Sequence, residues 1–172
     1  MIKLIGILCI LFGSTGVGMS CAKDLELRIS ELSQIRQWML LFKGELRYMH
    51  QPLPEILMHL SEKTVPPFCE FFIKIAEDME SRKGQSAEQI WKQHLSICIS
   101  GLHLTRQEIK ELERLGSVLG YLDLEMQINT FDYYLEQLES SVRQAQEDSK
   151  NRKKLYQYMG ILGGAALSIL IF

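Results

Sequence analysis

Two uncharged stretches near the ends of the chain set the strongest limit on its fold. Residues 4–22 are 19 consecutive residues without a charge, and residues 155–172 are 18. A bilayer core about 30 Å thick is crossed by about 20 helical residues, because each residue adds 1.5 Å. In hydrocarbon the backbone must satisfy its own hydrogen bonds, which makes helix the form expected of such short segments. We therefore predict one transmembrane helix in residues 1–22 and a second in residues 155–172.

The first apolar run has other interpretations, which the sequence leaves open. Lys3, the apolar stretch after it and the small residues near Ser20 loosely fit a cleaved signal peptide. Cys21 could also carry a lipid, as in bacterial lipoproteins, but the Leu expected three residues before that cysteine is replaced by Gly18. Residues 1–22 are thus either a retained anchor or a segment that is removed or lipidated.

Small residues recur at intervals of four in both apolar runs. Gly16 and Ser20 share one helix face, and so do Gly160, Gly164 and Ser168. Such faces let two membrane helices approach closely. We predict that these residues pack membrane helices, either within the chain, between copies or against another membrane protein.

The charges separate an acidic middle from a basic neck. Residues 23–149 carry a net charge of −7, and Lys150, Arg152, Lys153 and Lys154 precede the second apolar run. The positive-inside rule places the middle segment in the cytoplasm and both termini across the membrane. This collar also favours anionic headgroups. An acidic segment lacks the clustered Lys and Arg that phosphate contacts need, so no nucleic-acid partner is expected.

The middle segment, residues 23–154, has the apolar periodicity of helices. From residue 24 to residue 50 the apolar residues follow one another at steps of three and four, which is one stripe of a long helix. They are Leu25, Ile29, Leu32, Ile35, Met39, Phe42, Leu46 and Met49. Pro52 and Pro54 end this helix.

Two further helices are bounded by Pro and Gly. A short one begins near Leu53 and stops before Pro66 and Pro67, which can start the next helix. That helix stops near Gly84. Its predicted buried residues are Phe68, Phe71, Phe72, Ile75 and Met79.

Side-chain caps mark the last three helices. Ser86 with Gln89, and Thr105 with Glu108, have the spacing of capping boxes, and Asp123 can cap the sixth helix. The predicted apolar face of the fourth helix is Ile90, His94 or Leu95, Ile97 and Cys98; the predicted stops of the fourth and fifth helices are Gly101 and Gly120. The sequence therefore predicts an all-α fold, a six-helix cytoplasmic bundle flanked by N- and C-terminal transmembrane helices.

No residues point to catalysis or to a metal. The four histidines, His50, His59, His94 and His103, form no HExxH pattern, and none lies four residues from another. The cysteines of the middle segment fall in apolar helical stretches and are expected in the core. We predict a non-enzymatic protein without a cofactor.

Several short motifs, in order along the chain, resemble the stage III sporulation protein AB family of endospore-forming bacteria. The similarity covers essentially the whole length. It is carried by residues 1–6, residues 34–37, Glu45-Leu46-Arg47-Tyr48 followed by Pro52-Leu53, and Leu115-Gly116 through Leu119-Gly120 followed by Asp123 and Gln127. A terminal apolar segment after a basic cluster also matches.

The resemblance implies a role in sporulation. Members of the family lie in the mother-cell membrane around the forespore and belong to a multiprotein channel. The cytoplasmic domain is similar to one domain of the platform proteins of type II secretion and type IV pilus machines, which work beside a hexameric ATPase. By analogy the chain would link the ATPase stage III sporulation protein AA, and other stage III sporulation channel proteins, to the membrane. It departs from the platform proteins in having one such domain where they have two.

Three motif residues have a direct physical interpretation. Glu45 and Tyr48 are the candidate partner-binding residues, exposed on a partner face, or else they hydrogen-bond across the bundle. Gly116 is expected to let a neighbouring helix approach.

An alternative function is a membrane organiser that forms homo-oligomers through its transmembrane helices and contacts no ATPase.

Overall fold

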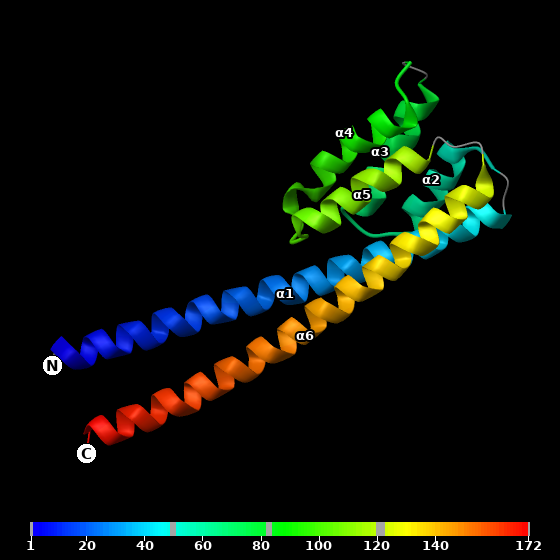
Figure 1. The fold of residues 1–172 in the computed structure, drawn as a ribbon. Coiled ribbons are helices and arrows are strands. Elements are labelled where there is room, and N and C mark those ends of the chain that lie inside the picture. The colour runs from blue at the N-terminus through cyan, green and yellow to red at the C-terminus, as the bar shows by residue number, and fades with distance from the viewer. Residues whose placement is uncertain (1, 49–50, 82–83, 120–122, 172) are drawn as a thin grey trace. The chain divides into compact units, whose positions relative to one another are not determined.

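The chain is all-helical in a computed structural model that describes the backbone of residues 2–48, 51–81, 84–119 and 123–171 (Figure 1). Side chains are described for these residues except 2–22, 152–154 and 156–171. The elements are α1 (Ile2–Tyr48), α2 (Leu53–Lys63), α3 (Phe68–Glu80), α4 (Ala87–Cys98), the 3-10 turn η1 (Ile99–Gly101), α5 (Arg106–Val118) and α6 (Leu124–Ile171). The six predicted helices are confirmed, and no strand occurs within the described ranges.

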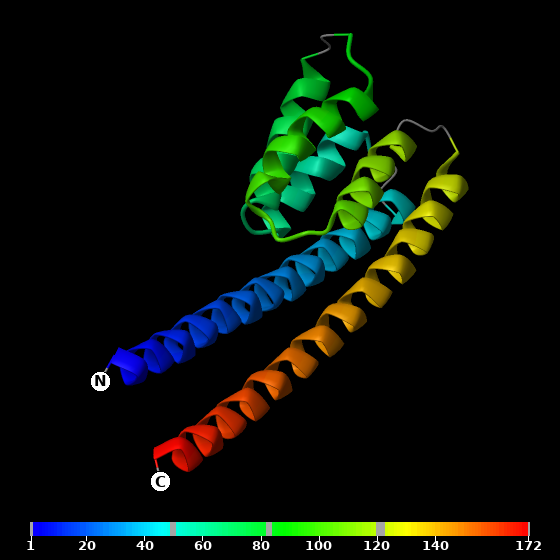
Figure 2. The same ribbon diagram turned by 60° about the vertical axis from the view of Figure 1, so that its left-hand side comes forward.

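The chain divides into two compact units. One comprises Met1–Ile29 and Arg143–Phe172, and the other is Ser30–Val142. Helices α1 and α6 are unbroken through both units, as Figures 1 and 2 show. The four shorter helices belong to the second unit, where α2 packs on α3, α3 on α4, and α4 on α5.

An aromatic cluster forms the core of the unit Ser30–Val142. The ring of Trp38 on α1 lies 5.3 Å from that of Phe72 and 6.2 Å from those of Phe68 and Trp91, measured between centroids. Large aromatic side chains bury the most apolar area per residue, and tilted or edge-on contacts suit their quadrupoles. This cluster therefore joins α1 to α3 and α4. A second edge-on pair, Phe42 with Phe131 at 5.0 Å, joins α1 to α6.

The predicted apolar stripe of α1 is confirmed from Leu32 to Leu46. Its buried apolar residues are Leu32, Ile35, Trp38, Met39, Phe42 and Leu46. Trp38 is not part of the predicted stripe, yet it lies at the centre of the core. It is buried because α3 and α4 both supply aromatic rings on that side of the helix.

The predicted apolar face of α4 is wrong at its C-terminal end. The buried residues are Ile90, Trp91 and Leu95, whereas Ile97 is 59% exposed. Ile97 comes seven residues after the buried Ile90 and lies within about 20° of it around the helix. Its exposure therefore reflects its place in the last turn of α4, where an open groove borders it. The indole N–H of Trp91 donates to the carbonyl oxygen of Leu112 at 2.8 Å, which fixes the buried face of α4 toward α5.

The predicted caps of α4 and α5 are confirmed as capping boxes. The amide of Gln89 donates to Ser86 Oγ at 3.2 Å, and the amide of Ser86 donates to Gln89 Oε1 at 3.1 Å. Thr105 and Glu108 form the same reciprocal pair at 3.3 and 2.7 Å. Asp123 caps α6, because its Oδ1 accepts from the amide of the second helical residue at 2.9 Å. These local bonds satisfy amide groups that the first turn of a helix leaves without partners.

Two of the three glycines predicted to end helices lie among the described residues. Helix α3 ends at Glu80 and Gly84 has a φ of 76°, the left-handed conformation that glycine adopts without steric cost. Gly101 closes η1, the 3-10 turn that follows α4. Gly120 lies outside the described residues.

The predicted membrane segments form the outer parts of α1 and α6. Among the residues whose side chains the structure describes, no helix is long and apolar enough to cross a membrane. Apart from Leu155, the side chains of residues 1–22 and 155–172 lie outside that part, and so do the predicted packing residues Gly16, Ser20, Gly160, Gly164 and Ser168.

Candidate partner-binding site at the end of α1

The two candidate partner-binding residues lie one turn apart at the C-terminal end of α1, and the structure places them differently. Glu45 is 6% exposed and Tyr48 is 79% exposed. A three-residue step leaves the two positions about 60° apart around the helix, so they are neighbours on its surface. Because only Glu45 is covered by the bundle, the two side chains differ in what they can contact.

Glu45 connects two helices of the bundle. Its Oε1 accepts a hydrogen bond from Lys63 Nζ at 2.8 Å, and Lys63 is the last residue of α2. Its Oε2 is buried and has no hydrogen-bond partner within the described ranges. A buried carboxylate is costly unless it is paired, so Lys63 is what makes this position tolerable for an acid. This geometry matches the second interpretation of Glu45, a bond across the bundle, and its contact with a partner stays a prediction.

Tyr48 projects from the last turn of α1 beside Arg47, which is also exposed. Tyr and Arg dominate the binding energy of many protein interfaces, because a large flat side chain can be desolvated together with a polar end. An exposed Tyr beside an exposed Arg is therefore suited to a protein contact. Both residues end a long rigid element, which limits the entropy lost when a partner binds.

Two long-range bridges fix the helices that carry this site. Glu31 on α1 accepts from the backbone N–H of His103 at 2.7 Å through Oε2, and its Oε1 lies 2.8 Å from His103 Nδ1. Lys43 on α1 pairs with Asp132 on α6. These contacts join residues 72 and 89 positions apart. No local spacing signals such pairs, which is why the sequence does not predict them.

Gly116 confirms its predicted role as a point of close helix approach. A Cβ placed on Gly116 would lie 2.2 Å from Trp91 Cδ1 and 2.9 Å from Trp91 Cβ. Non-bonded carbon atoms do not pack this closely, so any side chain at position 116 would push α4 and α5 apart or displace Trp91. The packing of α4 on α5 therefore requires glycine here. The indole bond to Leu112 holds the same ring in place from the side.

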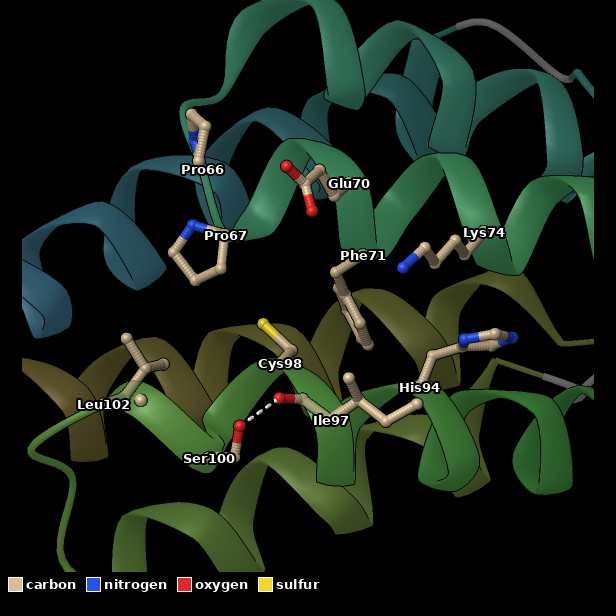
Figure 3. A pocket seen from close by; sticks show the side chains of 11 residues that line it. Pro66, Pro67, Glu70, Phe71, Lys74, His94, Ile97, Cys98, Ser100 and Leu102 are labelled. Atoms are coloured by element: carbon tan, nitrogen blue, oxygen red, sulfur yellow. Dashed lines mark hydrogen bonds between the residues drawn. The ribbon is translucent and has the colours of Figure 1, made fainter.

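A groove of about 460 Å³ lies between α3 and α4 (Figure 3). Figure 3 shows Phe71 and Cys98 directed into it, with Lys74 on the α3 wall and Ile97 on the α4 wall. His94 closes one end, where its Nε2 lies 2.7 Å from Asp78 Oδ2. The sequence does not predict this groove, because its periodicity assigns Ile97 to the core.

The thiol in the groove is not an activated nucleophile. Burial, and secondarily the negative charge of Glu70, raise the pKa of the Cys98 thiol from 9.0 to about 12. Nucleophilic attack needs the thiolate, so Cys98 is protonated and unreactive near neutral pH. Burial likewise raises the pKa of the Tyr134 phenol. The described residues contain no group of three or more His, Cys, Asp or Glu that could hold a metal ion.

The membrane-proximal collar is described in part. Lys150 is exposed on α6. The side chains of Arg152, Lys153 and Lys154 lie outside the described residues, so the surface that the collar forms stays a prediction.

Fold and site together define a class of protein: an all-helical bundle whose buried polar residues bridge helices and whose exposed aromatic residue ends a long helix. The sequence profile of the family described as stage III sporulation protein AB matches residues 3–172. The chain therefore belongs to the stage III sporulation protein AB family.

Two relatives agree with this assignment. The stage III sporulation protein AB of Bacillus subtilis (strain 168) is 26% identical over 171 residues, which cover 99% of this chain and 99% of the relative. A solved structure of a stage III sporulation protein AB has a TM-score of 0.66 at 23% identity, and the match covers 72% of this chain and 97% of that chain. At this identity the solved structure supports the helical fold.

Proposed function

We propose that the protein is a non-enzymatic membrane scaffold of the sporulation channel between mother cell and forespore. It links a cytoplasmic secretion-type ATPase, stage III sporulation protein AA, to the membrane channel. One observation carries the proposal: α1 and α6 each run unbroken from the apolar ends of the chain into the bundle. A continuous helix transmits a displacement along its axis, because every turn is hydrogen-bonded to the next.

The charge pattern supports the membrane part of this proposal. The apolar ends are long enough to span a bilayer, and the four basic residues from Lys150 to Lys154 precede the second one. Each basic residue near an anionic surface contributes about 1 kcal/mol. The proposed location is the mother-cell membrane around the forespore, with the bundle in the cytoplasm.

Tyr48 supports the partner part of the proposal. The bundle carries a net charge of −7 over residues 23–149, which would attract a basic surface on the ATPase. Tyr48 and Arg47 would form the anchored centre of that contact, since both are exposed at the end of α1. Glu45 would act indirectly, by holding α2 against the helix that presents them.

A binding measurement with matched variants tests the ATPase contact. The purified full-length chain in detergent micelles is titrated with stage III sporulation protein AA. Tyr48→Ala is expected to weaken binding by about tenfold, the loss typical of an interface anchor. The control is Tyr133→Ala on α6, a residue that is 59% exposed. Equal effects of the two substitutions would contradict the assignment of the contact to Tyr48. Absence of binding by the wild-type chain would contradict the proposed link to the ATPase.

The alternative is a membrane organiser without ATPase contact. It is favoured by the four-residue spacing of Gly160, Gly164 and Ser168. In that case Gly160→Leu with Gly164→Leu would abolish assembly, while the wild-type chain would never bind the ATPase. The titration above therefore separates the two functions.

A further inference from the structure

The α3 wall of the groove carries two opposite charges one helical turn apart. Glu70 and Lys74 are both exposed and line the groove. Neither forms an ion pair with another residue that the structure describes. A spacing of four residues puts them on the same helix face. The α3 wall of the groove thus carries one negative and one positive side chain on the same helix face, and their charges sum to zero.

Apolar surface accompanies this charge pair. Phe71 forms the floor, and Ile97 stands on the opposite wall (Figure 3). An Ile that is 59% exposed beside an apolar hollow leaves surface in water that a partner could cover. The combination has the composition of an interface, an apolar centre with charged residues at its edge.

We propose that this groove is the contact surface between two copies of the chain, related by a two-fold axis. A two-fold contact places the same patch on both sides, so that residue i meets j and j meets i. With the two α3 helices antiparallel, Glu70 of each copy faces Lys74 of the other, and both charge pairs form at once. The same operation brings each Ile97 toward the apolar hollow of the opposite copy.

The charge arrangement favours a second copy over other occupants. A nucleic acid or a strongly basic protein would need a surface of one sign. Glu70 and Lys74 on this wall have opposite charges. The wall is therefore complementary to the same wall of a second copy whose α3 runs in the opposite direction. The proposal does not depend on the ATPase contact, which is assigned to Tyr48 at the end of α1.

Charge reversal gives a test that a general loss of folding cannot imitate. Two forms of the full-length chain in detergent, each with a different affinity tag, are mixed and co-purified. Glu70→Lys paired with itself places the introduced ammonium group against Lys74, and Lys74→Glu paired with itself places two acids together. Like charges in contact oppose binding, so each self-pair should show at least about a tenfold loss of recovery relative to wild type.

The mixed pair restores the contact. When the Glu70→Lys form meets the Lys74→Glu form, opposite charges again face each other, and recovery should return to the wild-type level. Failure of the mixed pair to recover would overturn the proposal. Equal recovery of all pairs, which would indicate association through other segments, would overturn it as well, and so would a wild-type chain that does not pair with itself.

A second pair of variants tests the apolar part. Ile97→Ser should lower recovery by about tenfold, because it removes the exposed apolar side chain from the contact. Met58→Ser on α2, which is 41% exposed and lies outside the groove, should leave recovery unchanged. An equal effect of the two substitutions, or no effect of Ile97→Ser, would contradict the two-fold contact. Fluorescence of the two buried tryptophans confirms that each variant is folded.

Discussion

At the scale of single residues, the bundle depends on close approach at a few points and tolerates polar groups where another helix supplies a partner. Gly116 lies directly beneath the ring of Trp91, and Glu45 is buried against Lys63. The first of these was predictable, since a Gly inside an amphipathic helix indicates a packing or conformational need. The pairing of Glu45 with Lys63 was not predictable. The two interpretations of Glu45, a partner contact or a bond across the bundle, differ only in which residues the fold brings next to it.

A substitution at Gly116 tests the closest of these contacts. Gly116→Ala should destabilise the bundle by about 1–3 kcal/mol, the usual cost of adding a methyl group to a filled core. Gly44→Ala is the control: Gly44 is helical, and a Cβ there would meet nothing within 4 Å. That change should stabilise by roughly 0.5–1 kcal/mol through helix propensity. Urea unfolding followed by tryptophan fluorescence measures both, and similar values for the two would refute the close approach.

The pKa of Cys98 predicts slow alkylation. Because its pKa is about 12 in the folded chain against 9.0 ordinarily, the folded state keeps a proton that an unfolded chain loses between these values. The thiol therefore disfavours the folded state progressively as pH rises from 9 to 12. At pH 8.5, iodoacetamide should modify Cys98 on the order of a hundredfold more slowly in the native chain than in urea.

Peptide mass spectrometry measures this rate. Glu70→Gln should speed the native reaction, because it removes the charge that opposes the thiolate. Glu88→Gln in the first turn of α4, where Glu88 pairs with Lys92, should not. Equal rates in native and unfolded chains would show that the thiol is not held in the protonated form.

At the scale of elements, local signals were reliable and tertiary ones were not. The capping boxes at Ser86 and Thr105 require residues only three apart, so the sequence alone predicted them. The burial of Trp38 and Trp91 depends on rings from α3 and on the position of α5, and it was missed. The same holds for the groove, because the exposure of Ile97 depends on how much of the last turn of α4 the neighbouring helices cover.

The cap of α5 supplies an element-scale prediction. Thr105→Ala removes the acceptor of the Glu108 amide and should cost about 1 kcal/mol. Thr130→Ala on α6 is a matched control, since Thr130 donates back to the Met126 carbonyl within its own helix and caps nothing. Thermal unfolding should show a lower midpoint for the first change alone. A drop of the same size in both would mean that loss of any Thr hydroxyl, rather than of the cap, is responsible.

At the scale of the whole molecule, we propose that the chain is anchored at both apolar ends and holds its bundle in the cytoplasm. The unbroken course of α1 and α6 from these ends into the bundle gives this proposal its physical basis. The family assignment places the chain in sporulation, and the anchor, the ATPase contact and the two-fold contact are our proposals.

Cysteine labelling in sporulating cells tests this claim most directly. In a chain whose four cysteines are replaced, Gln85→Cys puts one thiol on an exposed loop residue of the bundle. The chain is expected to stay with membranes through an alkaline wash, and a membrane-impermeant maleimide is expected to label position 85 only after the cells are permeabilised. Release by the wash would contradict the membrane anchoring, and labelling of position 85 in intact cells would contradict the cytoplasmic location of the bundle.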